Sequence, residues 1–553
     1  MSRRTNGKTA PLRLRRRLLF GGILSLLLWL TGLPGPAWGA DVSKPIDYGE
    51  DGDEDPLLLL PAPERAARRS CTLCHLFVEP TMLTRDNLET QILPRMKVRL
   101  GVAKPDFASS PEGEIIRARR IYTEHPLVPV EDWPLIEEFY LKNAPEKPLP
   151  QGPKPEITIG LKLFDTVRPR WRFNPPSTTL VKLSEKPGRI YVGDDRAKSL
   201  ALLDAEGSLM TTIPLGNVPV DLVEREEGLY VTCIGSFIPS EIWRAELLLI
   251  PRKGDGFGEK QVLLRNLPRA SQTVFADFNG DGREDFAMCM FGNLTGRFSW
   301  FENLGEGRYR EHVLTDHTGA MNAAVHDFNG DGKPDLAVLF AQDLEQLMIL
   351  LNDGKGGFSG TSVFQRPPVW GHSYFELADF NQDGRMDLIV CNGDNGEYDS
   401  PTKNYHGIRI LLNRGDLDFE EAFFYPMNGC YRALARDFDA DGDLDLAAIS
   451  FFPDYALSPK ESFVYLENVG GNKPGEFKFE TSTFRECISG RWIVGDVGDL
   501  DGDGDPDIVL GSYIHGPTSV PKFLLDIWEP RGFSIQILRN RMKPQAAGRP
   551  PLQ

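Results

Sequence analysis

The sequence has 553 residues, of which 41% are hydrophobic and 25% charged, so it is long enough to form more than one hydrophobic core. Its formal net charge is -17, without a basic patch outside the N-terminal segment, which excludes nucleic acid as the expected partner because phosphate contacts need clustered Lys and Arg. The 43 Pro and 54 Gly residues are typical of a loop-rich β protein.

Residues 1–39 predict a secretory signal peptide. Seven basic residues precede an apolar core from Leu18 to Leu30, and Ala37 and Gly39 stand where a signal peptidase reads small residues. This core would span only about 20 Å as a helix, which is short of a hydrocarbon layer of about 30 Å. We therefore expect a cleaved signal, a periplasmic or extracellular location, and no membrane span once the signal is removed.

Residues 40–150 contain a motif for covalent haem attachment. Cys71, Cys74 and His75 form a C-x-x-C-H sequence, in which the two thiols can add to the vinyl groups of one haem and the histidine can bind the iron. A redox dithiol would need a βαβ context, and a zinc site would need two further ligands, whereas no Cys or His follows before His125. We predict one haem c, with both thiols on one helical turn.

A methionine is the expected sixth ligand of the iron. Met82 lies only seven residues after His75, so the chain would have to reverse almost at once, whereas Met96 has room to reach the distal face. We predict Met96 as the distal ligand; Met82, or ordinary core packing of Met96, is the alternative. Apolar residues at helical spacing between Val130 and Ala144 predict a helix that packs on the haem helix.

Residues 60–145 resemble a class of short monohaem cytochrome c domains. The C-x-x-C-H motif carries most of the resemblance, and a Pro-x-Met followed by Leu-Gly adds to it. The matching residues are Cys71, Cys74, His75, Pro80, Leu93, Pro94, Met96, Leu100 and Gly101. The resemblance implies a small all-α domain with one haem.

A tandem repeat follows a proline-rich linker at 151–159. Five near-identical nonamers, such as DFNGDGRED, start 50, 52, 58 and 62 residues apart, a period that is typical of propellers and arrays. They begin at Asp277, Asp327, Asp379, Asp437 and Asp499.

Each nonamer has the composition of a calcium loop. Asp or Asn at positions 1, 3, 5 and 9 supplies side-chain oxygens, and Gly at position 6 allows a sharp turn. An EF-hand would need Glu at position 12 and flanking helices, but β-type apolar runs follow instead. Solvated Asp-Gly turns are the alternative. We predict about five calcium sites, with ligands Asp277, Asn279, Asp281, Asp285, Asp327, Asn329, Asp331, Asp335, Asp379, Asn381, Asp383, Asp387, Asp437, Asp439, Asp441, Asp445, Asp499, Asp501, Asp503 and Asp507.

Counting the repeats predicts a closed ring. Each nonamer lies between two strands, and an Asn-x-Gly turn recurs later in four of the units, which suggests four strands per unit. Two degenerate units precede the first nonamer, so residues 160–541 would form seven blades, with a disordered tail at 542–553. These repeats resemble the FG-GAP/VCBS family of calcium-bearing propellers, which also occur in integrin α heads. The expected fold is a small all-α cytochrome c domain followed by an all-β, seven-bladed propeller.

No catalytic motif stands out in the sequence. The function that we expect is electron transfer, with the propeller as a docking platform for a redox partner protein or a small-molecule substrate. The alternatives are a propeller that oxidises a substrate and passes electrons to the haem, and a propeller that serves adhesion or carbohydrate binding.

The loops between second and third strands must open on the face opposite the nonamers. We expect the haem domain or an external redox partner to dock on that face, on a surface that includes Arg432, Arg491 and Trp492. The alternative is that these side chains cap the central channel.

Overall fold

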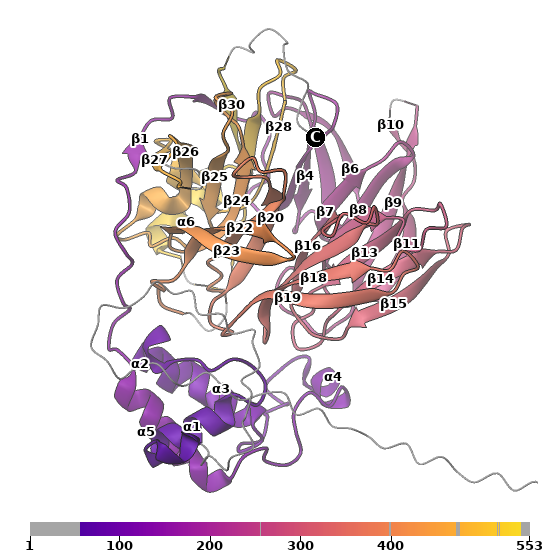
Figure 1. Cartoon of the computed structure of the whole chain (residues 1–553). Coiled ribbons are helices and arrows are strands. Elements are labelled where there is room, and N and C mark those ends of the chain that lie inside the picture. The colour runs from indigo at the N-terminus through magenta and orange to yellow at the C-terminus, as the bar shows by residue number, and fades with distance from the viewer. Residues whose placement is uncertain are drawn as a thin grey trace, which may run out of the picture.

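The computed structural model describes residues 56–254, 256–396, 400–471, 476–516, 518 and 520–542. The predicted signal peptide and almost all of the predicted tail lie outside these residues. A helical domain is followed by a ring of seven β-sheets, and the helices lie against one face of the ring (Figure 1). Among the described residues, no helix is long and apolar enough to cross a membrane.

The helical domain is built around two crossing helices. Small residues on α1, Ala66 and Ala67, let it approach α5, which contributes Trp133, Ile136 and Tyr140 to the same core. Tyr140 donates its hydroxyl to the carbonyl of Val78 at 3.0 Å, which satisfies a buried polar group. The helices are α1 (Ala62–Cys71), α2 (Arg85–Asn87), α3 (Leu93–Arg99), α4 (Gly113–Ala118) and α5 (Trp133–Asn143). The helix predicted at 130–144 is confirmed by α5.

The seven-bladed propeller is confirmed, and each blade is a four-stranded antiparallel sheet or an elaboration of one. The first blade contains β3 (Thr178–Leu183), β4 (Ile190–Asp194), β5 (Ser199–Leu203) and β6 (Leu209–Pro214). The second contains β7 (Pro219–Glu224), β8 (Gly228–Cys233), β9 (Ala245–Lys253), β10 (Gly256–Phe257) and β11 (Gln261–Leu267). The third contains β12 (Ala270–Ala276), β13 (Asp285–Met290), β14 (Arg297–Asn303) and β15 (Tyr309–Thr315).

The fourth and fifth blades contain β16 (Ala320–His326), β17 (Asp335–Phe340), β18 (Glu345–Asn352) and β19 (Phe358–Arg366); and β20 (His372–Ala378), β21 (Asp387–Asn392), β22 (Gly407–Gly415) and β23 (Asp418–Pro426). The last two blades contain β24 (Cys430–Arg436), β25 (Asp445–Ser450), β26 (Phe463–Asn468), β27 (Phe479–Thr483) and β1 (Thr158–Ile159); and β28 (Trp492–Gly498), β29 (Asp507–Ser512), β30 (Ile535–Asn540) and β2 (Phe164–Val167).

The ring is closed by a strand from the start of the propeller. β2 pairs antiparallel with β30 as the outermost strand of the seventh blade, so residues near 165 and near 538 share one sheet. β1, in the predicted linker, pairs parallel with β27 in the sixth blade. The linker therefore runs along the propeller surface instead of hanging free. The seventh blade also carries a helix, α6 (Lys522–Arg531), between β29 and β30, so the propeller is not wholly β.

The second strands form the densest part of each blade. All residues of β13, β17, β21, β25 and β29 are buried, because each of these strands is covered by a neighbouring blade on both sides. This explains their continuous apolar sequences, such as DLAVLF. Cys289 and Cys391 lie in these strands and are buried, and all seven cysteines are free thiols.

The innermost strands are tied together around the central channel. Each of the seven has a bulge near its first residues, and each junction between blades carries at least one hydrogen bond between a side chain and the neighbouring backbone. For example, Asn322 accepts from the N–H of Phe375 at 2.9 Å. The other six side chains are Thr179, Asp221, Gln272, Glu376, Arg432 and Asp496.

Candidate functional site

The C-x-x-C-H segment begins where helix α1 ends. Only Cys71 lies in the helix, and residues 72–75 form a bent turn, so the prediction of both thiols on one helical turn is wrong. Cys71 packs on the helical core, whereas Cys74 is exposed. At this end the C-cap, Thr72, donates its hydroxyl back to the carbonyl of Arg68 at 2.8 Å, which satisfies one of the last carbonyls of the helix.

His75 has the orientation that a metal ligand needs. Its Nδ1 lies 2.8 Å from the carbonyl oxygen of Leu76, and a carbonyl can only accept, so Nδ1 carries the proton. Nε2 therefore has its lone pair available. A backbone carbonyl bonded to one ring nitrogen is the usual arrangement for a histidine that binds a metal through the other. Two free thiols and this histidine fit a c-type haem.

Met96 and Met82 lie in different surroundings. Met96, on α3, packs against the same apolar cluster as Cys71, Phe77 and Ile92. Met82 lies at the boundary with the propeller, where its carbonyl accepts from the hydroxyl of Tyr405 at 3.3 Å. Only Met96 thus shares a core with the haem-attachment segment, although the distal ligand itself stays a prediction.

The helical domain contacts the propeller face that is opposite the nonamer loops. The contact residues on the propeller come from loops between second and third strands, or from a connection between blades: Glu241, Thr295, Asp343, Val369 and Tyr405. Cys74 faces this surface. Although the residue as a whole is exposed, partial burial of its sulfur and then the charge of Asp343 raise the pKa of its thiol.

Two of the residues expected on the docking surface are buried instead. Arg491 is 1% exposed and Trp492 is 0% exposed. The guanidinium of Arg491 donates to the carbonyl of Phe451 at 3.0 Å and lies over that ring at 3.9 Å. Arg432 bonds to the backbone of the neighbouring blade in the channel. Burial keeps Arg491 and Trp492 out of a partner's reach, so the prediction that a partner would contact these two is wrong. Arg432 is half-buried, and its contact with a partner stays a prediction.

The five nonamers connect the first and second strands of the third to seventh blades, as predicted. Their geometry repeats closely. In the first of them, Asp277 accepts from the N–H groups of Gly280 and Gly282, both at 2.8 Å, which folds the loop around its carboxylate. The left-handed backbone at Gly282 (φ 82°) explains the glycine at position 6.

The Asp at position 9 has a structural role in every loop. It is fully buried in all five, and one of its oxygens accepts from the backbone N–H of an Asn at the end of the third strand. In the first loop this bond joins Asp285 to Asn303 at 2.7 Å. The other four pairs are Asp335–Asn352, Asp387–Asn413, Asp445–Asn468 and Asp507–Asn540. In the first four pairs this Asn opens the Asn-x-Gly motif, so the recurrence of that motif is the sequence signal for the contact.

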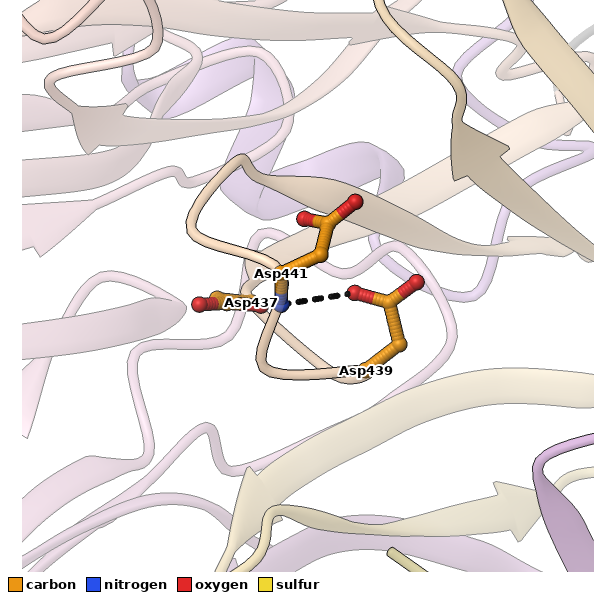
Figure 2. A group of neighbouring side chains, drawn as sticks. All are labelled: Asp437, Asp439 and Asp441. Carbon is orange, nitrogen blue, oxygen red and sulfur yellow. Dashed lines mark hydrogen bonds between the residues drawn. The ribbon is translucent and has the colours of Figure 1, made fainter. Parts of the chain in front are cut away.

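The fourth and fifth loops differ from the others in charge. Each carries five Asp residues and no basic residue, whereas each of the first three pairs its position-5 Asp with an Arg or Lys at position 7. One oxygen from each of Asp437, Asp439 and Asp441 lies within 4.8 Å of the others (Figure 2). Asp499, Asp501 and Asp507 converge in the same way. Carboxylates at this spacing could hold a metal ion.

The electrostatics of the loops follow from this difference. Burial first, and neighbouring carboxylates with it, raise the pKa of Asp445 to about 7 and that of Asp507 to about 6. In the second loop the Lys333 ammonium instead lowers the pKa of Asp331. The fourth and fifth loops therefore hold an excess of negative charge that a cation would neutralise. In the fifth, Arg539 offsets part of this charge, with 3.4 Å between its Nε and Oδ2 of Asp501.

Comparison with known proteins agrees with the repeat. The model of the FG-GAP-like repeat family matches residues 277–338 and 327–390, which contain the first three nonamers. The chain therefore contains FG-GAP repeats. No curated protein matches the chain.

Several solved structures are similar to this chain at low identity. BBS1N, solved in complex with ARL6DN, is 10% identical over 70% of this chain and 97% of that chain, with a TM-score of 0.42. The Dos1 propeller is 10% identical over 66% and 78%, with a TM-score of 0.40. Sqt1 of Saccharomyces cerevisiae is 9% identical over 68% and 98%, with a TM-score of 0.38. Likenesses this distant bear on neither ligand nor partner.

Proposed function

We propose that this chain is an exported electron-transfer protein, in which the helical domain carries one covalent haem c and the calcium-stabilised propeller is its docking platform. The observation that supports it best is the orientation of His75. Its Nδ1 contacts the carbonyl of Leu76 at 2.8 Å, which leaves Nε2 for iron directly after the second thiol of the attachment motif.

Four residues of the helical domain would hold the haem and its iron. Cys71 and Cys74 would hold the haem through thioethers, His75 would bind the iron on one side, and Met96 on the other. The haem supplies reversible one-electron chemistry when bound. The apolar core around Cys71 and Met96 excludes water from that region, and a low local dielectric favours the less charged oxidation state.

The propeller would position the haem domain and a redox partner, which is either a protein or a small-molecule substrate. Support comes from the contacts between Glu241 or Tyr405 and the helical domain, which hold the C-x-x-C-H segment near the loops of the fourth blade. Calcium in the nonamer loops would stiffen the opposite face of the ring, because each loop links an innermost strand to a buried second strand.

Covalent haem content tests this function. The full chain is produced with its N-terminal segment in a host that exports and matures c-type cytochromes, and haem that resists acid-acetone extraction is measured from its absorption. We expect one haem per chain in the wild type and none in the Cys71→Ser/Cys74→Ser variant. Cys289→Ala, which changes a buried thiol of the propeller, is the control and should keep its haem. A wild-type protein without covalent haem would refute the proposal.

A further inference from the structure

The carboxylate of Asp505, at position 7 of the fifth nonamer, is buried without a partner. The residue is 5% exposed, and neither Oδ1 nor Oδ2 finds a hydrogen-bond donor among the described residues. Its side chain contacts that of Asp503. Both groups accept hydrogen bonds and neither donates when ionised, so their contact is repulsive unless a proton or a metal cation lies between them.

The same position holds a cation in the first three loops. Arg283 pairs there with Asp281, and Lys333 pairs with Asp331 at 2.9 Å. Arg385 pairs with Asp383 in the third loop, and also donates to the carbonyl of Asn413 at 2.8 Å. In each of these loops a basic side chain neutralises the position-5 carboxylate from within the protein. In the fifth loop, a second carboxylate takes its place.

We propose that the Asp505 side chain is an additional calcium ligand, and that the fifth loop is therefore a tighter calcium site than the first three. This inference rests on calcium binding by the nonamer loops, which is part of the proposed function. A hard cation between Asp503 and Asp505 satisfies both carboxylates, and Ca²⁺ accepts six to eight oxygens in flexible geometry. More ligand charge around the ion raises its affinity.

The fourth loop has the same chemistry in a more open setting. Asp443 occupies position 7, and its Oδ1 is buried without a hydrogen-bond donor, as is Oδ1 of Asp437. The whole residue is only half-buried, however. We therefore expect the fourth loop to follow the fifth in affinity, with the first three loops weaker.

Calorimetric titration of the full chain with Ca²⁺ alone, after removal of metal on a chelating resin, tests the assignment. We expect the wild type to show a tight class of sites and a weaker class. Asp505→Asn should weaken one tight site by about tenfold, because one charged ligand is lost. Lys333→Asp in the second loop, which reproduces the pattern of the fifth, should tighten a weak site.

Thermal unfolding of the metal-free protein gives an independent reading. Because Asp505→Asn removes a buried unpaired charge, it should raise the melting temperature without calcium while reducing the stabilisation that calcium adds. Asp499→Asn removes the predicted ligand at position 1 of the same loop, and the calcium site that this variant loses is therefore the site of the fifth loop. If Asp499→Asn loses a site while Asp505→Asn binds like the wild type, the ligand role of Asp505 is refuted and calcium binding stands. If the wild type binds no calcium, both are refuted.

Discussion

Arg119 of the helical domain and Glu241 of the second blade form an ion pair across the domain boundary, with 3.0 Å between Nη1 and Oε2. Glu241 is 1% exposed and also accepts from the backbone N–H of Leu294. The guanidinium of Arg119 lies over the ring of Trp243, 4.5 Å from its centroid. A second carboxylate, that of Glu112, accepts from Ser240 beside it. Helix α4 is thus fastened to the propeller by polar groups at both ends.

Removal of the Arg119 side chain should loosen the helical domain. In Arg119→Gln, Glu241 keeps its bond to Leu294 but loses its counter-ion, and we expect the docked state to lose about 2 kcal/mol. Proteolysis within the linker at 151–159 should become faster, and small-angle scattering should show a larger radius of gyration. Arg117→Gln, which breaks an exposed pair within α4, is the matched control. Identical proteolysis of both variants and the wild type would show that this ion pair does not hold the domain.

Substitution of Met96 should open one face of the iron. If its sulfur binds the iron, Met96→Ala should bind carbon monoxide in the reduced state, which the wild type should not, and its reduction potential should fall. Met82→Ala is the control, because Met82 lies at the propeller boundary and contributes a backbone carbonyl to Tyr405. Carbon monoxide binding by Met82→Ala alone would transfer the ligand role to Met82.

The parts that sequence predicted correctly are those with a repeated pattern. Five nonamers, the apolar runs after them and two degenerate units before them predicted the seven blades and the strands that each loop connects. The residues that sequence missed depend on contacts between distant segments. Arg491 is charged, as surface residues commonly are, yet it is buried, and its Nε and Nη2 donate to the carbonyl of Phe451 and the hydroxyl of Thr518. The closing strand β2 has only four residues, too few for a recognisable period.

Loss of the Phe164 ring should destabilise the closure of the propeller. Phe164, on β2, is 3% exposed and packs against Phe438 and Tyr465, with ring centroids 5.5 and 5.4 Å away. Phe164→Ala should lower the free energy of unfolding by about 3–5 kcal/mol, because a cavity opens between the sixth and seventh blades. Phe523→Ala on α6 is the control: it removes a 59% exposed ring and should change the free energy of unfolding by no more than about 0.5 kcal/mol. Equal unfolding midpoints in denaturant for the two variants would show that the Phe164 ring does not stabilise the junction between the sixth and seventh blades.

Without calcium, the free energy of unfolding should fall as the pH rises through the range in which buried carboxylates of the fourth and fifth loops titrate. Burial holds the pKa of Asp445 at about 7 and that of Asp507 at about 6, above the ordinary value of 3.8. Between pH 4 and 7, roughly, the folded protein then binds more protons than the unfolded chain, so each rise in pH favours unfolding. Each unit by which a pKa is displaced is worth about 1.4 kcal/mol.

Calcium should reverse this dependence. The ion needs ionised carboxylates, so protons compete with it at low pH, and the calcium-bound protein should gain stability as the pH rises. Melting temperatures of resin-treated protein at pH 5 and pH 8, with and without added Ca²⁺, measure both slopes. The double variant Asp445→Asn/Asp507→Asn should make the calcium-free slope shallower, because amides do not titrate. Asp443 and Asp505, whose pKa values are raised to about 6 and about 7, keep part of the slope. A calcium-free melting temperature that is the same at both pH values would show that these carboxylates keep their ordinary pKa, and that the two loops need no cation.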